Sequence, residues 1–227
     1  MTITLAFDIY GTLIDTHGVK TSLAGMVGDR AGAFSNLWRE KQLEYSFRRG
    51  LMQNYQDFSV CTRDALEYCC KQLGEDLSSE QKQQLLQEYR TLPAFPDVEP
   101  CLKQLQVGDY RMYAFSNGAA DAVTGLLQHA GIEQYFDGVV SVDDIKSFKP
   151  NPAVYAHFLR RSGATSARAW LVSSNPFDVI GAVSAGMSAA WVQRSPQAVF
   201  DPWSIEPTIT VTSLKQLDSG IAGCVRN

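Results

Sequence analysis

The sequence has no excess of basic residues, no long apolar run and few histidines. Its net charge of −4 provides no basic surface of the kind that binds nucleic acid. No apolar stretch approaches the length of a membrane span, and the N-terminus lacks the basic region and apolar core of a signal peptide. His17, His129 and His157 have no spacing typical of a zinc site. We therefore expect no nucleic-acid partner, no membrane partner and no zinc.

Cysteine is also scarce. The five cysteines include no C-x-x-C pair, and their odd number favours reduced thiols in a cytoplasmic protein. A catalytic thiol needs a histidine partner, and the local sequence around each cysteine offers none. The chain has no internal repeat and no low-complexity segment. Its 227 residues, 45% hydrophobic and 19% charged, fit a globular enzyme of one large domain or two modest ones.

Short apolar runs that end in polar loops are what the sequence does contain. They predict strands at residues 3–6, 111–115, 139–142, 169–172 and 189–193. Helices are expected at 119–130, before Gly131, and from Pro152 to Gly163, with Asn151 as the N-cap. Strands that alternate with helices predict an α/β fold with a mostly parallel sheet and right-handed crossovers. The tail from Ser195 looks turn-rich.

A block of helical sequence interrupts this alternation after the first strand. Helices are expected at residues 35–52, 62–73 and 79–90, the last capped by Ser78 or Ser79, and Pro93 and Pro96 close the block. Such an insert is typical of a cap over an active site. We therefore predict a core domain made of residues 1–14 and 96–227, and a helical cap subdomain made of residues 15–95.

One charged residue of the cap stands on a partly apolar helix face. At about 100° per residue, Arg39 lines up with Ser46 and Gly50, and Leu43 lies close beside them. The small neighbours leave room around the guanidinium. By itself this pattern leaves open whether Arg39 faces a site or is a surface arginine whose charged end reaches solvent.

Four loops at predicted strand ends, or just beyond them, carry polar residues. They are residues 8–12, Ser116-Asn117, Lys149, and residues 173–178. A parallel sheet brings such loops to one edge. Each loop alone could be a turn, a solvated charge or the start of a helix. Together and in this order, they predict a functional site.

The first of these loops resembles the first motif of the haloacid dehalogenase superfamily, D-x-D-x-[TV], whose first Asp is the nucleophile. Here the motif reads Asp8-Ile9-Tyr10-Gly11-Thr12, with Tyr10 in place of the second Asp. The phosphatases of the superfamily use that second Asp as general acid and base, because a departing alkoxide needs a proton. A departing halide needs none. Tyr10 therefore favours carbon–halogen cleavage.

Over nearly the whole chain, the finer resemblance is to the L-2-haloacid dehalogenases, which have a Rossmann-like parallel core and an inserted helical cap. It implies that Asp8 is the nucleophile, with Thr12 as its hydroxyl neighbour and Lys149 holding it ionised. The resemblance further implies a catalytic set, a halide cradle, and other substrate-binding residues. The catalytic set adds Arg39, Tyr155, Ser173, Asn175 and Asp178. The halide cradle is made of Arg39, Asn117 and Phe177, and substrate also contacts Ile9, Tyr10, Leu43 and Ser116.

The fourth loop discriminates between the chemistries of the superfamily. Phosphatases place adjacent acidic residues there to hold magnesium, whereas this chain has Ser173, Ser174 and Asn175, and only Asp178 is acidic. We therefore expect a site without metal or other cofactor. One departure is Phe177, where relatives normally have a larger aromatic residue, so the halide pocket can differ in size. The run from Gly181 to Gly186 has the wrong spacing for a nucleophilic serine elbow.

The resemblance implies a hydrolase that converts short (S)-2-haloalkanoic acids to (R)-2-hydroxyalkanoic acids and halide through an aspartyl ester. It also implies a homodimer whose only other partner is the small 2-halocarboxylate. Two alternatives stay open at this point. One is a metal-dependent phosphatase of the same superfamily. The other is a non-catalytic protein that binds small anions on the same scaffold.

Overall fold

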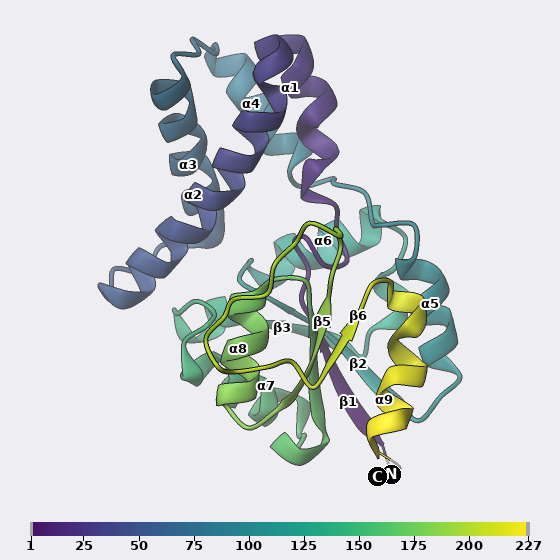
Figure 1. Ribbon diagram of the computed structural model, residues 1–227. Coiled ribbons are helices and arrows are strands. Elements are labelled where there is room, and N and C mark those ends of the chain that lie inside the picture. Colours follow the sequence, from purple (N-terminus) through teal and green to yellow (C-terminus); the bar gives the residue numbers. More distant parts are fainter. Residues whose placement is uncertain (1, 226–227) are drawn as a thin grey trace.

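A parallel six-stranded sheet forms the centre of the protein in the computed structural model, which describes residues 2–225 (Figure 1). The strand order is β3-β2-β1-β4-β5-β6, and every neighbouring pair is parallel. The strands are β1 (Ile3–Phe7), β2 (Tyr110–Ser116), β3 (Gly138–Ser141), β4 (Ala169–Ser173), β5 (Ser188–Val192) and β6 (Ile209–Val211). This confirms the predicted α/β class and the parallel sheet.

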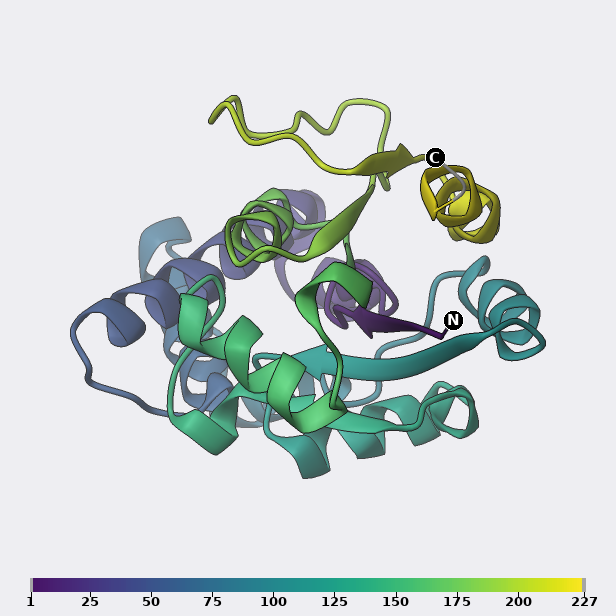
Figure 2. The same ribbon diagram turned by 90° about the horizontal axis from the view of Figure 1, so that it is seen from below.

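Helices cover both faces of the sheet. One face packs against α5 (Val98–Gln106), α6 (Ala120–His129) and α9 (Leu217–Val225), and the other against α7 (Pro152–Ser162) and α8 (Pro176–Ser184). Leu5 and Phe7 of β1 enter the first core, whereas Ala6 enters the second. A strand buried on both faces reads as a continuous apolar run, which is why residues 3–6 stood out. In both views α5 and α9 lie side by side (Figures 1 and 2).

Four helices form a separate group above the carboxyl edge of the sheet (Figure 1). They are α1 (Lys20–Val27), α2 (Ala31–Leu51), α3 (Phe58–Leu73) and α4 (Ser79–Glu88). The two chain segments that join this group to the sheet lie side by side. The amide of Phe95 donates to the Leu13 carbonyl at 2.9 Å, and the amide of Asp15 donates to the Pro93 carbonyl at 2.8 Å.

Side-chain caps set several of the helix boundaries. Ser78 and Gln81 form a capping box at the start of α4, and the Asn151 side chain accepts from the amide of Ala153 at the start of α7. Helix α3 begins at Phe58 instead of residue 62, because Asp57 accepts from the amides of Ser59 and Val60. Helix α2 begins at residue 31, four residues before the predicted start, and has no side-chain cap there.

The chain after residue 195 is more regular than predicted. It forms β6 and α9, and α1 and α5 were also absent from the prediction. The glycines in α9 lower its helix propensity, but Leu217 and Ile221 are fully buried in the core that contains α5. Tertiary packing thus overrides a weak local signal. Within residues 2–225, no helix is long and apolar enough to cross a membrane.

Candidate active site

Asp8 follows β1 directly, at the carboxyl edge of the sheet. The strand order reverses between β1 and β4, so the loop after β1 lies beside the loop after β4 at the topological switch point. Gly11 completes the turn with a φ of 85°, a backbone conformation that favours glycine. The carboxylate is buried. A buried carboxylate needs hydrogen-bond partners, and the neighbouring loops supply them.

The two oxygens of Asp8 have different surroundings. Oδ2 accepts from Thr12 Oγ1 at 2.8 Å, from Asn175 Nδ2 at 2.7 Å and from Ser173 Oγ at 3.3 Å. Oδ1 accepts from Lys149 Nζ at 3.2 Å. One oxygen is therefore held by three uncharged donors, while the other faces a single cation.

Lys149 lies between two carboxylates. Its ammonium donates to Asp8 Oδ1, to Asp178 Oδ2 at 2.8 Å and to the Phe115 carbonyl at 2.9 Å, which occupies all three of its N–H groups. The side chain is 1% exposed. Burial by itself lowers the pKa of Lys149, but the charges of Asp178 and Asp8 outweigh it, and the pKa lies above its ordinary value. Lys149 therefore stays charged.

Asp178 and Tyr155 complete this buried cluster. The Tyr155 hydroxyl donates to Asp178 Oδ1 at 2.8 Å. Burial, with a smaller contribution from the charge of Asp8, raises the pKa of Asp178 to about 6. The positive charge of Lys149 opposes this shift but does not cancel it. Burial and the charge of Asp178 also raise the pKa of Tyr155, so the phenol stays neutral and acts as a donor. Two carboxylates thus share one ammonium.

A glycine in α8 lets Tyr155 reach Asp178. A Cβ atom at Gly181 would overlap the Tyr155 hydroxyl. Gly181 belongs to the run with the wrong spacing for a serine elbow, and the structure gives this glycine a packing role instead.

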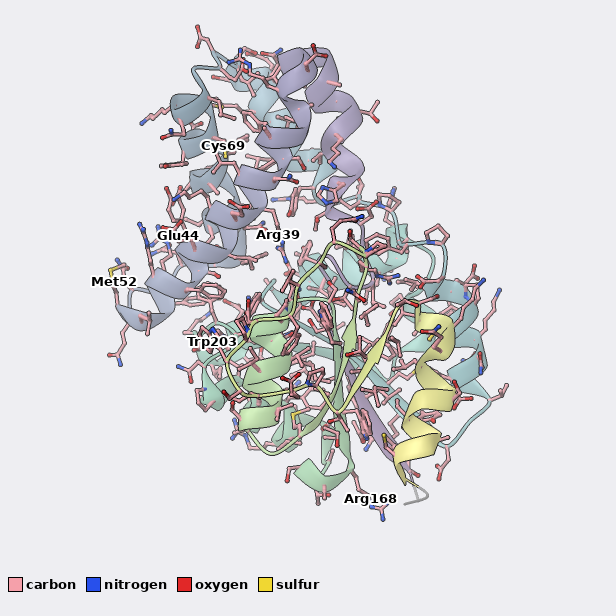
Figure 3. All side chains as sticks on the ribbon, viewed as in Figure 1. Arg39, Glu44, Met52, Cys69, Arg168 and Trp203 are labelled. Atoms are coloured by element: carbon pink, nitrogen blue, oxygen red, sulfur yellow. The ribbon has the colours of Figure 1, made fainter. Side chains whose placement is uncertain are left out.

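Arg39 reaches the site from the helical group. In Figure 3 its side chain projects from α2 toward the core. Nη2 donates to the Tyr10 carbonyl at 3.1 Å, and the same carbonyl accepts from Asn175 Nδ2 at 3.3 Å. Since Asn175 also donates to Asp8, one carbonyl and one amide separate the guanidinium from the carboxylate. The structure thus places Arg39 beside the candidate nucleophile.

The other predicted site residues surround this cluster to different degrees. Ser116 ends β2 and Asn117 follows it; both are buried, and Asn117 Oδ1 accepts from the amide of Lys149 at 2.9 Å. Phe177 makes an edge-to-face contact with Phe47 of α2 at a centroid distance of 5.0 Å. Ile9 belongs to the hydrophobic core, and Leu43 on α2 is half-buried. Side-chain hydrogen bonds thus connect Asp8, Thr12, Lys149, Tyr155, Ser173, Asn175 and Asp178, and they extend to Asn117 through the amide of Lys149 and to Arg39 through the Tyr10 carbonyl.

Comparison with known proteins agrees with this geometry. A family model described as haloacid dehalogenase-like hydrolase matches residues 4–186. The chain belongs to this family. The (S)-2-haloacid dehalogenase of Pseudomonas sp. strain YL is 35% identical over 93% of this chain and 90% of its own. The (S)-2-haloacid dehalogenase of Xanthobacter autotrophicus is 38% identical over 94% of this chain and 84% of its own.

A solved structure of a family member gives the same fold. The L-2-haloacid dehalogenase of Xanthobacter autotrophicus with chloropropionic acid covalently bound superposes with a TM-score of 0.89. It is 34% identical, and the match covers 98% of this chain and 99% of that one. The resemblance to this family in the sequence is therefore confirmed.

Ser174 supports the family's first loop and was not predicted as a site residue. Its hydroxyl donates to the Gly11 carbonyl at 2.7 Å, and its amide donates to Thr12 Oγ1 at 2.8 Å. Ser174 thereby orients the Thr12 hydroxyl, which donates to Asp8. Ser174 lies between Ser173 and Asn175, two predicted residues of the fourth loop, and this position was the sequence signal that could have identified it.

Arg194, also unpredicted, bonds to the backbone of the same loop. Its guanidinium donates to the Thr12 carbonyl and to both oxygens of Asp97, at 2.7 and 2.8 Å. Asp97 in turn accepts from the hydroxyl of Ser213 and the amide of Leu214, both at 2.9 Å. These groups are far apart in the chain, so no local sequence pattern could have paired them.

Proposed function

We propose that this chain is a hydrolase acting on carbon–halogen bonds, an (S)-2-haloacid dehalogenase that works through an ester of Asp8. The observation that carries the proposal is the short connection from Arg39 to Asp8 through Tyr10 and Asn175. A departing halide needs a cation near the attacked carbon and needs no proton. The relatives named above as (S)-2-haloacid dehalogenases support the same reaction.

In the first step, Asp8 Oδ1 attacks the halogen-bearing carbon from the side opposite the halogen. The C–O bond forms as the carbon–halogen bond breaks, the halide leaves with the electron pair, and the carbon is inverted. Oδ1 is suited to attack because it accepts only from Lys149 among the described contacts, whereas Oδ2 accepts from three donors. Arg39, with Asn117 and Phe177, receives the halide, and Ser116 binds the substrate carboxylate.

In the second step, water attacks the side-chain carbonyl carbon of Asp8. Negative charge then develops on Oδ2, where Thr12, Ser173 and Asn175 already donate, so these groups form an oxyanion hole. Asp178 takes the proton from water. Collapse of the intermediate expels the alkoxide, which takes the proton from Asp178 and leaves as the (R)-2-hydroxy acid. The Asp8 carboxyl group then loses the second proton of the water to solvent and is a carboxylate again.

The donor set supports metal-independent chemistry. Lys149 Nζ contacts both acidic side chains of the cluster, Asp8 at 3.2 Å and Asp178 at 2.8 Å, and an ammonium there repels a divalent cation. In residues 2–225, no three His, Cys, Asp or Glu side chains are grouped so that they could hold a metal ion. The remaining neighbours, Thr12, Ser173 and Asn175, are uncharged.

Residues 15–95 act as a cap in this proposal. Support comes from the paired crossing segments and from the reach of Arg39 and Phe47 into the site. The cap limits access of bulk water while the halide leaves. The homodimer stays a prediction that rests on the family resemblance, and the cytoplasmic location stays a prediction that rests on the cysteine pattern.

Halide release with a chelator present separates the three functions. We expect the purified protein to release chloride from (S)-2-chloropropionate at an undiminished rate in excess chelator, because Lys149 supplies the positive charge. The product is measured as (R)-lactate by chiral chromatography. Added magnesium should create no phosphatase activity above trace. Activity lost with the chelator and restored by magnesium would favour the phosphatase, and binding without turnover would favour the non-catalytic alternative.

Hydrolysis of the ester is expected to slow as pH falls. Asp178 must be ionised to accept a proton, and its pKa in the free protein is raised to about 6. In the ester, Asp8 has no charge, and one cause of the raised pKa of Asp178 is removed. The inflection in the pH profile of ester decay therefore lies at or below pH 6. Below it, the single-turnover rate of ester decay should fall about tenfold per pH unit and should be level at pH 7–8. A rate that rises in proportion to hydroxide from pH 6 to 8 would contradict this role of Asp178.

A further inference from the structure

Gln42 is a fully buried polar residue for which the reaction so far gives no role. It lies on α2 three residues after Arg39, a spacing that places two side chains on the same face of a helix. Its Oε1 accepts from Arg39 Nη1 at 2.7 Å and from the Tyr89 hydroxyl at 3.1 Å. Its Nε2 donates to Thr62 Oγ1 at 2.6 Å.

These contacts allow only one orientation of the amide. The Thr62 hydroxyl donates to the Phe58 carbonyl at 2.9 Å, so it can only accept from Gln42. This fixes Nε2 toward Thr62 and therefore Oε1 toward Arg39. A flipped amide would place an NH₂ group against the guanidinium and its oxygen against the Thr62 oxygen, whose hydrogen is already donated to Phe58.

The fixed amide restricts a long side chain. A free arginine side chain has several rotatable bonds. Its planar guanidinium presents donors to an anion in a defined geometry only when the orientation of that plane is fixed. Nη1 is held by Gln42 and Nη2 by the Tyr10 carbonyl, so two contacts on different elements define the guanidinium plane. Arg39 has five N–H donors, and these two bonds leave donors for an anion.

We propose that Gln42 is a positioning residue that orients Arg39 to receive the departing halide. The inference rests on the dehalogenase function proposed above. It assigns Gln42 to the first step alone, because halide leaves in that step and the ester is hydrolysed without it.

The leaving group provides a readout that loosening of the cap would not reproduce. Chloride is a poorer leaving group than bromide, so cleavage of the carbon–chlorine bond depends more on stabilisation of the departing anion. Loss of orientation at Arg39 should therefore slow reaction of chlorinated substrate more than that of brominated substrate. It should also weaken product inhibition by free bromide, which binds the same guanidinium.

The test variant is Gln42→Met, which keeps the length of the side chain and removes both polar atoms. Single-turnover formation and decay of the Asp8 ester are followed by mass spectrometry with (S)-2-chloropropionate and (S)-2-bromopropionate. Leu66→Ala is the matched control, because Leu66 is fully buried in the cap, on α3, and its truncation loosens the cap without removing a polar contact to Arg39. Arg39→Lys is the reference variant, because it keeps the positive charge and loses the planar guanidinium.

Ester formation from the chlorinated substrate should fall about 10- to 100-fold in Gln42→Met, the range for a lost hydrogen bond to a charged group. The loss with the brominated substrate should be several times smaller, and ester decay should stay within about twofold of wild type. Leu66→Ala should lower Tm and leave the chloride-to-bromide rate ratio unchanged. An unchanged ratio in Gln42→Met, or equal loss in both steps, would overturn the proposal.

Gln42→Glu decides the question if the Met variant does not fold. Glu is nearly isosteric and still accepts from Arg39 and Tyr89, but it cannot donate to Thr62, and its negative charge neutralises the guanidinium. The inhibition constant for bromide should then rise at least about tenfold, as expected for loss of a charge-assisted contact. An unchanged constant would overturn the proposal. Wild-type protein that releases no halide from either substrate would instead refute the dehalogenase function itself, whatever the variants do.

Discussion

Replacement of Lys149 by Met is expected to lower halide release by at least about 10³-fold, since it removes the only cation bonded to the Asp8 carboxylate in the described structure. The same change should lower the free energy of unfolding at pH 7.5 by about 3–5 kcal/mol, because breaking a buried ion pair leaves charge without a partner. Turnover is measured as chloride release and stability by urea denaturation.

The stability loss in Lys149→Met should shrink as pH is lowered. Without the ammonium, burial and repulsion from Asp8 raise the pKa of Asp178 above its wild-type value of about 6. A carboxyl group whose pKa is raised on folding stabilises the folded state at low pH, and this contribution is lost as pH rises through the folded pKa. The difference from wild type should therefore be smaller at pH 5 than at pH 8.

Lys146→Met is the matched control for this prediction. Lys146 lies three residues earlier and pairs with Asp143 at 2.9 Å, but its side chain is 64% exposed. Surface ion pairs contribute about 0–1 kcal/mol, so this variant should remain within about 1 kcal/mol of wild type and keep full activity. Equal effects at the two lysines, or a Lys149→Met difference that grows as pH falls, would show that Lys149 does not sit between two ionised carboxylates.

The elements that could be predicted from the sequence are those with strong local signals. The buried strands are continuous apolar runs, and α7 has both a side-chain cap at Asn151 and a C-terminal glycine at Gly163 with a φ of 67°. Helix α9 and strand β6 lack such signals. Helix α9 forms because Leu217 and Ile221 pack against α5, more than 100 residues earlier in the chain, and β6 forms because it pairs with β5.

The residues of the candidate site also fall into those with a local sequence signal and those that only the fold brings together. Asp8, Lys149 and Asp178 lie in loops that follow predicted strands, and the parallel order of the sheet brings those loops together. Gln42 and Arg194 were missed for different reasons. Gln42 shares a helix face with Arg39, so its spacing was a usable signal, but its burial depends on Thr62 of α3 and on Tyr89, which directly follows α4. Arg194 acts on Thr12 from 182 residues away, and only the fold brings them together.

The covalent role of Asp8 predicts where the new oxygen of the product comes from. In a single turnover with excess enzyme in heavy-oxygen water, the label should enter the Asp8 side chain, and the 2-hydroxy acid should remain light. The reason is the bond that breaks in the second step. Water adds to the side-chain carbonyl carbon of Asp8, so the oxygen bonded to the substrate carbon is the original Oδ1. Mass analysis of the peptide that contains Asp8 measures the label.

Two controls sharpen this experiment. The peptide that contains Asp178 should stay light, because Asp178 accepts a proton and forms no ester. Asp8→Asn should show no halide release and no label, since a neutral amide at the same place is a poor nucleophile; we expect a loss of at least about 10⁴-fold on chlorinated substrate.

The geometry favours the ester, because Oδ2 is held by three donors that can stabilise an oxyanion while Oδ1 is left to attack. If Asp8 acted only as a general base, activated water would attack the substrate carbon itself. The hydroxy acid would then be heavy in the first turnover and the Asp8 peptide light, which is the opposite of the expected result.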